Sequence, residues 1–171
     1  ASTTRVWWTR IDPIHGGYSS LHSSMLDFGE PRNGGVFDPA VAGVPRFTDV
    51  SIAPDGRLWL TLHEGSAIFV VRDAGGGTIE RVLRNDLATG SRPYRITPGP
   101  DGAMWFTEQG ANMIGRITDS GVVTEFPLPR PNSGPYDIVA GPDGALWFTE
   151  FEGNAIGRIT TAGRVTEYAI P

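Results

Sequence analysis

Two segments of this 171-residue chain decide its fold: residues 142–150 read PDGALWFTE, and residues 100–108 read PDGAMWFTE. The two copies lie 42 positions apart, and aligning 93–129 on 135–171 without gaps gives 23 identities in 37 positions. A repeat of about this length is typical of one blade of a β-propeller. We therefore expect this part of the chain to consist of successive blades of the same design.

Weaker copies extend the repeat towards the N-terminus. Residues 54–61 read PDGRLWLT, and residues 6–9 retain only VWWT. The matching tryptophans of these two copies, Trp7 and Trp59, are 52 residues apart rather than 42, which places an insertion within roughly 10–34. We expect a single propeller or partial-propeller domain over 1–171, with blade units at 1–44, 45–92, 93–134 and 135–171.

Each unit is expected to form four short antiparallel strands. In the last unit these strands are predicted at 136–140, 145–150, 155–160 and 164–169. The Pro-Asp-Gly turn at 142–144 is a strong hairpin signal. No stretch of the sequence sustains a period of 3.6 residues, so no substantial helix is expected. The predicted fold class is all-β: a β-propeller of four-stranded antiparallel blades, with about four blades in this chain.

The predicted strands do not make a complete ring. The first unit begins at its second strand, so it lacks the strand that would line the central channel, and propellers usually close to remove exposed sheet edges. Three explanations stay open: a fragment of a longer propeller, two copies that close one ring, or a small four-bladed ring. We expect self-association or missing blades, because an open ring would expose an apolar blade face.

Composition excludes several classes of function. The formal net charge is −5 and no basic face is evident, so nucleic acid is not an expected partner. The chain has no cysteine, which excludes disulfides, zinc–thiolate sites and a thiol nucleophile. No run of 18 apolar residues is present, so no membrane span is predicted. The compartment stays open between cytoplasm and secretion.

The repeated motifs resemble those of a known family. The pattern is PY-x-I, then GPDGA-x-WFTE, then N-x-IGRIT, then G-x-VTE followed by Phe or Tyr. It resembles the virginiamycin B lyase, or streptogramin lyase, family: strongly over 93–171, fairly over 45–92 and thinly over 1–44. The resemblance implies a seven-bladed propeller with a Mg²⁺ site near the central channel. It also implies enzymes that open the ester ring of type B streptogramin antibiotics by elimination, a carbon–oxygen lyase reaction that confers antibiotic resistance.

The resemblance also implies where the chemistry lies. In the family a histidine at the second place of a Pro-His-x-Ile motif removes the proton alpha to the ester carbonyl, and Mg²⁺ polarises that carbonyl. A carboxylate that helps to hold the metal follows 14 residues later. The matching pairs here are Tyr94 with Glu108, Tyr136 with Glu150, and Thr48 with Leu62. This assigns Glu108 and Glu150 as candidate metal ligands, while the histidine place holds tyrosine twice and threonine once.

Further residues are candidates for the same end of the channel, where a small molecule would bind. His63 lies one residue beyond the glutamate place of its unit, so it joins Tyr94 and Tyr136 as a candidate catalytic residue. Arg95 and Asp137 follow the two tyrosines and would either form an ion pair between blades or line the substrate site with them. The inserted loop carries two further histidines that could bind a metal or stay solvated, His15 and His22.

Other repeated residues are expected to be structural. We expect the tryptophans to pack between blades, the glycines of the third strand to allow close approach of neighbouring strands, and the arginines of the Ile-Gly-Arg-Ile motif to link blades. These residues are Trp59, Trp105, Trp147, Gly115, Gly157, Arg116 and Arg158.

Two functions are therefore open. The first is a Mg²⁺-dependent carbon–oxygen lyase. The alternative is a ligand-binding or self-assembling propeller module without chemistry of its own, because the histidine places are lost.

Overall fold

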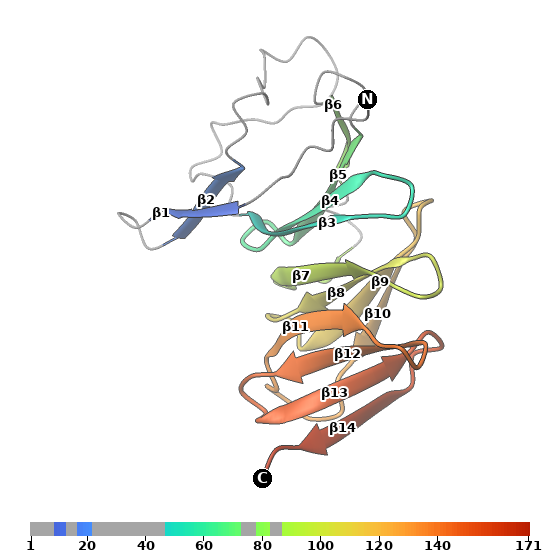
Figure 1. The fold of residues 1–171 in the computed structure, drawn as a ribbon. Helices are drawn as coiled ribbons and strands as arrows, with labels where there is room; N and C mark the ends of the chain where they lie inside the picture. Colours follow the sequence, from blue (N-terminus) through green and yellow to red (C-terminus); the bar gives the residue numbers. More distant parts are fainter. Residues whose placement is uncertain (1–8, 13–16, 22–46, 73–77, 83–86) are drawn as a thin grey trace.

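The computed structural model of the chain describes residues 9–12, 17–21, 47–72, 78–82 and 87–171 (Figure 1). They form fourteen β-strands, and every strand pairing among them is antiparallel. Among the described residues no helix is long and apolar enough to cross a membrane. The two histidines of the insertion, His15 and His22, lie outside the described residues. Part of that insertion forms a two-stranded hairpin, β1 (Thr9–Asp12) with β2 (Gly17–Leu21).

Three four-stranded sheets follow, each with its strands in chain order across the sheet. The first comprises β3 (Phe47–Ile52), β4 (Leu58–Leu62), β5 (Ala67–Arg72) and β6 (Thr78–Val82). The second comprises β7 (Pro93–Pro98), β8 (Met104–Glu108), β9 (Met113–Ile117) and β10 (Val123–Pro127). The third comprises β11 (Pro135–Ala140), β12 (Ala145–Glu150), β13 (Ala155–Thr160) and β14 (Val165–Ala169). The predicted all-β fold of propeller blades is confirmed.

The blades stack face to face, and their apolar side chains meet in two seams. The first seam lies between the β3–β6 and β7–β10 blades, where Trp59 packs with Met104 and Phe106. The second seam lies between the β7–β10 and β11–β14 blades, where Trp105 packs with Phe148 and neighbours from β13. The prediction that Trp59 and Trp105 pack between blades is confirmed, because both are almost fully buried there.

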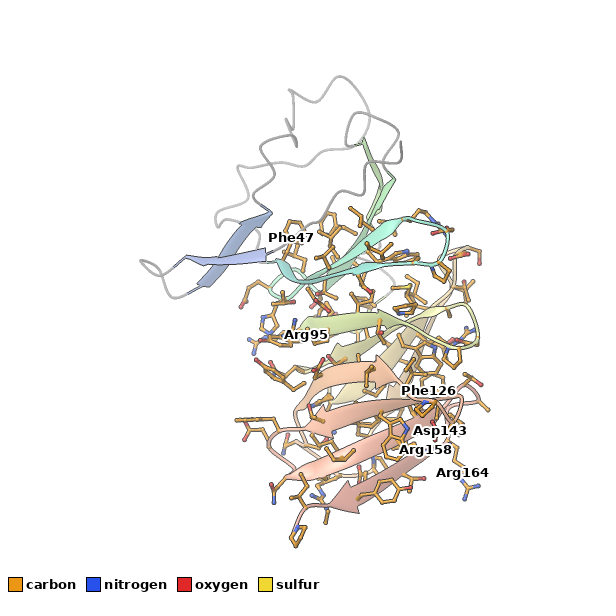
Figure 2. All side chains as sticks on the ribbon, viewed as in Figure 1. Phe47, Arg95, Phe126, Asp143, Arg158 and Arg164 are labelled. Atoms are coloured by element: carbon orange, nitrogen blue, oxygen red, sulfur yellow. The ribbon has the colours of Figure 1, made fainter. Side chains whose placement is uncertain are left out.

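The Pro-Asp-Gly turn does more than reverse the chain. Gly102 and Gly144 adopt φ of +78° and +73°, a conformation that glycine reaches at little cost. Asp143 accepts a hydrogen bond from the Trp147 indole (3.1 Å) and another from Arg158 (2.7 Å), and Figure 2 shows Asp143 and Arg158 close together at one end of the blade. These two bonds lower the pKa of Asp143 to about 2.

The same cluster recurs one blade earlier, with Asp101, Trp105 and Arg116. Each arginine therefore binds an aspartate of its own blade, so the prediction that Arg116 and Arg158 link neighbouring blades is wrong. The reason is register: Trp105 pairs with Arg116 across β8 and β9, and this brings the guanidinium over the turn of the same sheet.

Gly115 and Gly157 allow close approach, although the group that they admit is a ring rather than a strand. A Cβ atom on Gly115 would lie 2.1 Å from the ring of Phe106, and one on Gly157 would lie equally close to Phe148. Each ring thus occupies the space beside the glycine that faces it across the sheet. The β3–β6 blade solves the same packing differently, because it places Phe69 at the glycine position and Leu60 opposite it.

Candidate ligand-binding site

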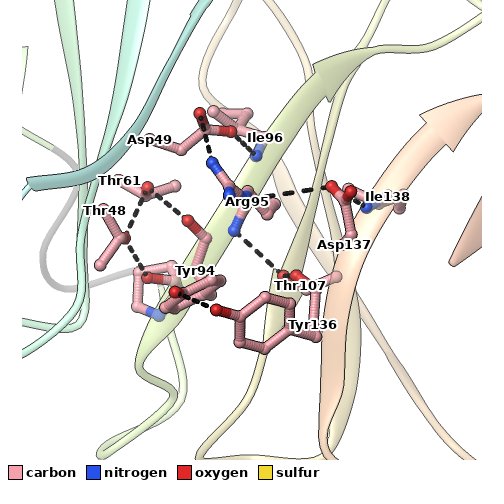
Figure 3. Close-up of polar contacts among 11 residues, drawn as sticks. Thr48, Asp49, Thr61, Tyr94, Arg95, Ile96, Thr107, Tyr136, Asp137 and Ile138 are labelled. Atoms are coloured by element: carbon pink, nitrogen blue, oxygen red, sulfur yellow. Dashed lines mark hydrogen bonds and ion pairs between the residues drawn. The ribbon is translucent and has the colours of Figure 1, made fainter. Parts of the chain in front are cut away.

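The innermost strands β3, β7 and β11 lie side by side (Figures 1 and 3). Threonine hydroxyls fix their spacing: Thr61 donates to the Tyr94 carbonyl, and Thr107 donates to the Tyr136 carbonyl, both at 3.0 Å. Each of these threonines lies on the second strand of one blade and bonds the first strand of the next. The threonine of the WFT motif is therefore an inter-blade link, a role that the sequence analysis missed.

Two tyrosines from neighbouring blades meet at the start of these strands. The hydroxyl oxygens of Tyr94 and Tyr136 are 2.5 Å apart, and their ring centroids are 4.3 Å apart (Figure 3). Both side chains are half-buried. The structure thus brings together the two residues that occupy the family's histidine place in these blades. Their rings offer apolar faces for stacking, and their hydroxyls can donate to and accept from a ligand.

The two tyrosines belong to a longer row of aromatic rings. The His63 ring lies edge-on to Tyr94 at 6.0 Å between centroids, and the Phe151 ring lies 6.1 Å from Tyr136. Phe151 is 72% exposed, so the row opens to solvent at that end. His63 follows β4 and its Nδ1 is 3.3 Å from Glu64 Oε1. The prediction that His63 faces the same end as the tyrosines fits this arrangement.

A charged row runs beside the aromatic one. Arg95 lies between Asp49 (3.3 Å) and Asp137 (3.9 Å), so one guanidinium faces carboxylates from the blades on either side (Figure 3). Burial raises the pKa of Asp49, although Arg95 and the Ile96 amide oppose the shift. Desolvation would lower the pKa of Arg95, but the two carboxylates raise it overall.

Of the two roles left open for Arg95 and Asp137, the structure shows the inter-blade ion pair. Sequence analysis missed Asp49, although a signal was available. Asp49 stands one residue after Thr48, as Arg95 and Asp137 stand one residue after the two tyrosines. Comparing the residue that follows the histidine place in all three blades would have found the acidic–basic–acidic row.

Glu108 and Glu150 are not brought together. Each ends the second strand of its blade and is almost fully buried, Glu108 in the first seam and Glu150 in the second. Burial and the neighbouring Glu125 carboxylate raise the pKa of Glu108 to about 8. Burial and Glu167 likewise raise the pKa of Glu150, against the lowering effects of Ser133 and Arg130. Within the described part of the chain, no three acidic, histidine or cysteine side chains gather as a metal site.

Comparison with known proteins places this geometry in a family. A sequence model of the virginiamycin B lyase family matches residues 44–171, three quarters of the chain. The chain belongs to the virginiamycin B lyase family. A curated virginiamycin B lyase from Nocardia farcinica is 37% identical over 91 residues, which cover 53% of this chain and 30% of that relative. The matched part therefore spans less than a third of that relative's length.

Solved structures of virginiamycin B lyase family members agree with the fold. A catalytically inactive histidine-to-alanine variant of virginiamycin B lyase from Staphylococcus aureus, solved with quinupristin, is 44% identical with a TM-score of 0.72. The match covers 80% of this chain and 44% of that chain. A streptogramin B lyase structure is 42% identical with a TM-score of 0.70, and it covers 74% of this chain and 41% of its own. The expected family resemblance is thus confirmed.

Proposed function

We propose that this chain supplies a substrate-binding wall of a streptogramin-type carbon–oxygen lyase, with the Tyr94–Tyr136 pair as its centre. The observation that carries the proposal is the meeting of two half-buried tyrosines at the position where the family places its histidine. A cyclic ester carries carbonyl oxygens and an apolar ring surface. The tyrosine hydroxyls would donate to the carbonyls, and the aromatic row would pack against the apolar surface.

The residues of this chain then have separate tasks. Tyr94 and Tyr136 hold the substrate face, and the opening at Phe151 admits it. Arg95 is fixed between Asp49 and Asp137, so it would present a positive edge beside the tyrosines while keeping the three innermost strands in register. Within the proposal, either tyrosine or His63 is a candidate to accept a proton from the carbon next to the one that bears the ester oxygen, so that the C–H electron pair forms the alkene as the carboxylate leaves.

The role of Mg²⁺ in this proposal comes from the family resemblance. In the family the ion polarises the ester carbonyl. Glu108 and Glu150 stand at the matching carboxylate places but point into separate seams. The described residues therefore do not bring these two carboxylates together to hold the ion.

Binding of quinupristin tests the proposal. Isothermal titration should show binding to the wild-type chain, weakening at least tenfold in Tyr136→Ala. Tyr168→Ala is the matched control, because Tyr168 stacks on Trp147 away from the aromatic row. Equal affinity in all three proteins, or no binding to the wild type, would reject the binding wall.

Chromatography with mass detection tests the lyase activity separately. Elimination opens the ring by breaking the ester C–O bond and forming a carboxylate and an alkene, so the linear product has the substrate's mass. Hydrolysis would add one water. Ring opening without a mass change supports the lyase. Binding without ring opening supports the alternative, a ligand-binding module without chemistry.

A second candidate function, self-assembly, is favoured by the outer face of the β11–β14 blade. Trp147 on this face is half-buried, whereas Trp105 at the matching place is fully buried by the next blade. We propose that a second copy of the chain covers this face. Light scattering should give about twice the chain mass of 18.4 kDa, and a monomer at all concentrations would reject the assembly.

A further inference from the structure

Tyr94 and Tyr136 bring two phenol rings from neighbouring blades into direct contact. Their hydroxyl oxygens are 2.5 Å apart, their ring centroids are 4.3 Å apart, and the ring planes are tilted by 39° (Figure 3). Because the hydroxyls meet, the ring carbons that flank each hydroxyl carbon lie at the same end of the pair. These ortho carbons are the atoms through which oxidised phenols join to one another. The structure thus brings the bonding atoms of a dityrosine together.

Hydrogen bonds to the backbone hold both tyrosines in this arrangement. Thr61 donates to the Tyr94 carbonyl and Thr107 donates to the Tyr136 carbonyl, each at 3.0 Å. The Arg95 guanidinium carbon lies 5.5 Å from the centroid of the Tyr94 ring and packs over it. Reacting groups that are held in contact combine far faster than the same groups on separate molecules. The fold therefore favours coupling within one chain over coupling between chains.

The pair is also within reach of a small oxidant. Both rings are half-buried, and the aromatic row ends at Phe151, which is 72% exposed. Tyr168 stacks on Trp147 instead, so it is not in the row. The sequence contains no cysteine that would consume an oxidant first. The two tyrosines of the row are therefore an accessible target for oxidation.

We propose that Tyr94 and Tyr136 form an oxidative modification site, at which a one-electron oxidant joins the two rings as dityrosine. Each phenol loses one electron to the oxidant and one proton to water. The two phenoxyl radicals then form a carbon–carbon bond between ortho carbons, and the hydrogen on each of these carbons moves to the neighbouring oxygen. The chain loses two hydrogen atoms in total. With persulfate as the oxidant, each cross-link yields two sulfate ions and two protons.

The cross-link would tie β7 to β11 by a covalent bond and so join one blade to the next. A bond between positions 94 and 136 closes a loop in the unfolded chain and reduces the number of conformations open to it. The modified protein should therefore be more stable than the unmodified one. The site rests on the contact between the two rings and does not depend on the lyase proposal.

Photo-oxidation of the full chain at low protein concentration tests the site. Light-activated ruthenium tris-bipyridine with persulfate supplies the one-electron oxidant. Mass spectrometry of the monomer should show the loss of two hydrogen atoms. After trypsin digestion, the peptide that contains Tyr94 should stay joined to the one that contains Tyr136, although Arg95 and Arg116 lie between them. The cross-linked monomer should also have a higher melting temperature than untreated protein.

Tyr136→Phe should abolish the cross-link, because a phenylalanine ring gives no phenoxyl radical. Tyr94→Phe should do the same from the neighbouring blade, so the test does not rely on the folding of one variant. Tyr168→Phe is the matched control and should cross-link as the wild type does. Wild-type protein in which oxidation leaves the two peptides separate, or joins only different chains, would overturn the proposal. Joined peptides that persist in both Tyr94→Phe and Tyr136→Phe would overturn it as well.

Discussion

The β3–β6 blade and the two blades after it fill the same packing positions with different chemistry. In the later blades a glycine admits a phenylalanine ring, and a buried glutamate ends the second strand. In the β3–β6 blade the glutamate place is Leu62 and the glycine place is Phe69, within a wholly apolar cluster. The repeat therefore fixes backbone position and strand register in all three blades. The side chains packed on each sheet face can be either polar or apolar. Four substitutions test how far this freedom extends.

Gly115→Ala should have the largest effect. The added Cβ would lie 2.1 Å from the Phe106 ring, which is fully buried. We expect a loss of about 3 kcal/mol in the free energy of unfolding, at the upper end for overpacked cores. Urea titration followed by tryptophan fluorescence measures it. Gly56→Ala is a control of another kind, since only its positive φ would cost energy. An equal, small loss in both would show that the ring does not require the glycine.

Glu108→Gln should change how stability depends on pH. The folded-state pKa of Glu108, about 8, lies above its ordinary 4.5. Its contribution is therefore complete below pH 4.5 and is lost as the pH rises through 8. Wild-type stability should fall across that window, whereas the stability of the variant should stay nearly level.

The two pH profiles should meet near pH 4 and diverge above pH 5, with the variant more stable. Profiles that run parallel from pH 4 to 9 would show that Glu108 titrates normally. The β3–β6 blade has Leu62 at the position that matches Glu108, so it has no titratable group there.

Much of this molecule could be predicted from its repeat. The strands of the last blade lie within one residue of their predicted ends, because turn residues and alternation fix them locally. The 42-residue offset also puts Tyr94 and Tyr136 on neighbouring innermost strands, and the structure brings their hydroxyls together there.

The features that the sequence did not predict depend on the face of the sheet on which a side chain lies. The sequence does not show directly that Glu108 lies in the seam, where alternation along β8 puts it on the same face as Phe106. The magnesium role assigned to Glu108 and Glu150 stays a prediction. Arg116 was expected to bridge blades, but register directs it to its own turn.

Asp101→Ala should have an intermediate effect. Asp101 accepts the Trp105 indole N–H at 2.9 Å, and the variant would leave that buried donor unpaired. We expect a loss of about 2 kcal/mol in unfolding free energy. Asp55→Ala is the matched control in the β3–β6 blade, where the Trp59 indole has no hydrogen-bond partner among the residues that the structure describes. Its loss should be smaller, and an equal loss would show that the indole bond contributes nothing.

Thr107→Val should have the smallest effect and test the link between blades. The Thr107 hydroxyl accepts the Arg95 amide within its blade and donates to the Tyr136 carbonyl of the next. Valine keeps the shape and removes both bonds, so we expect a loss of about 1 kcal/mol. Thr149→Val is the matched control, because Thr149 accepts the Asp137 amide but donates to no further blade among the described residues. Thermal unfolding should rank Thr149→Val as the milder change. The reverse order would mean that the bond within each blade, rather than the bond between blades, gives this threonine its structural role.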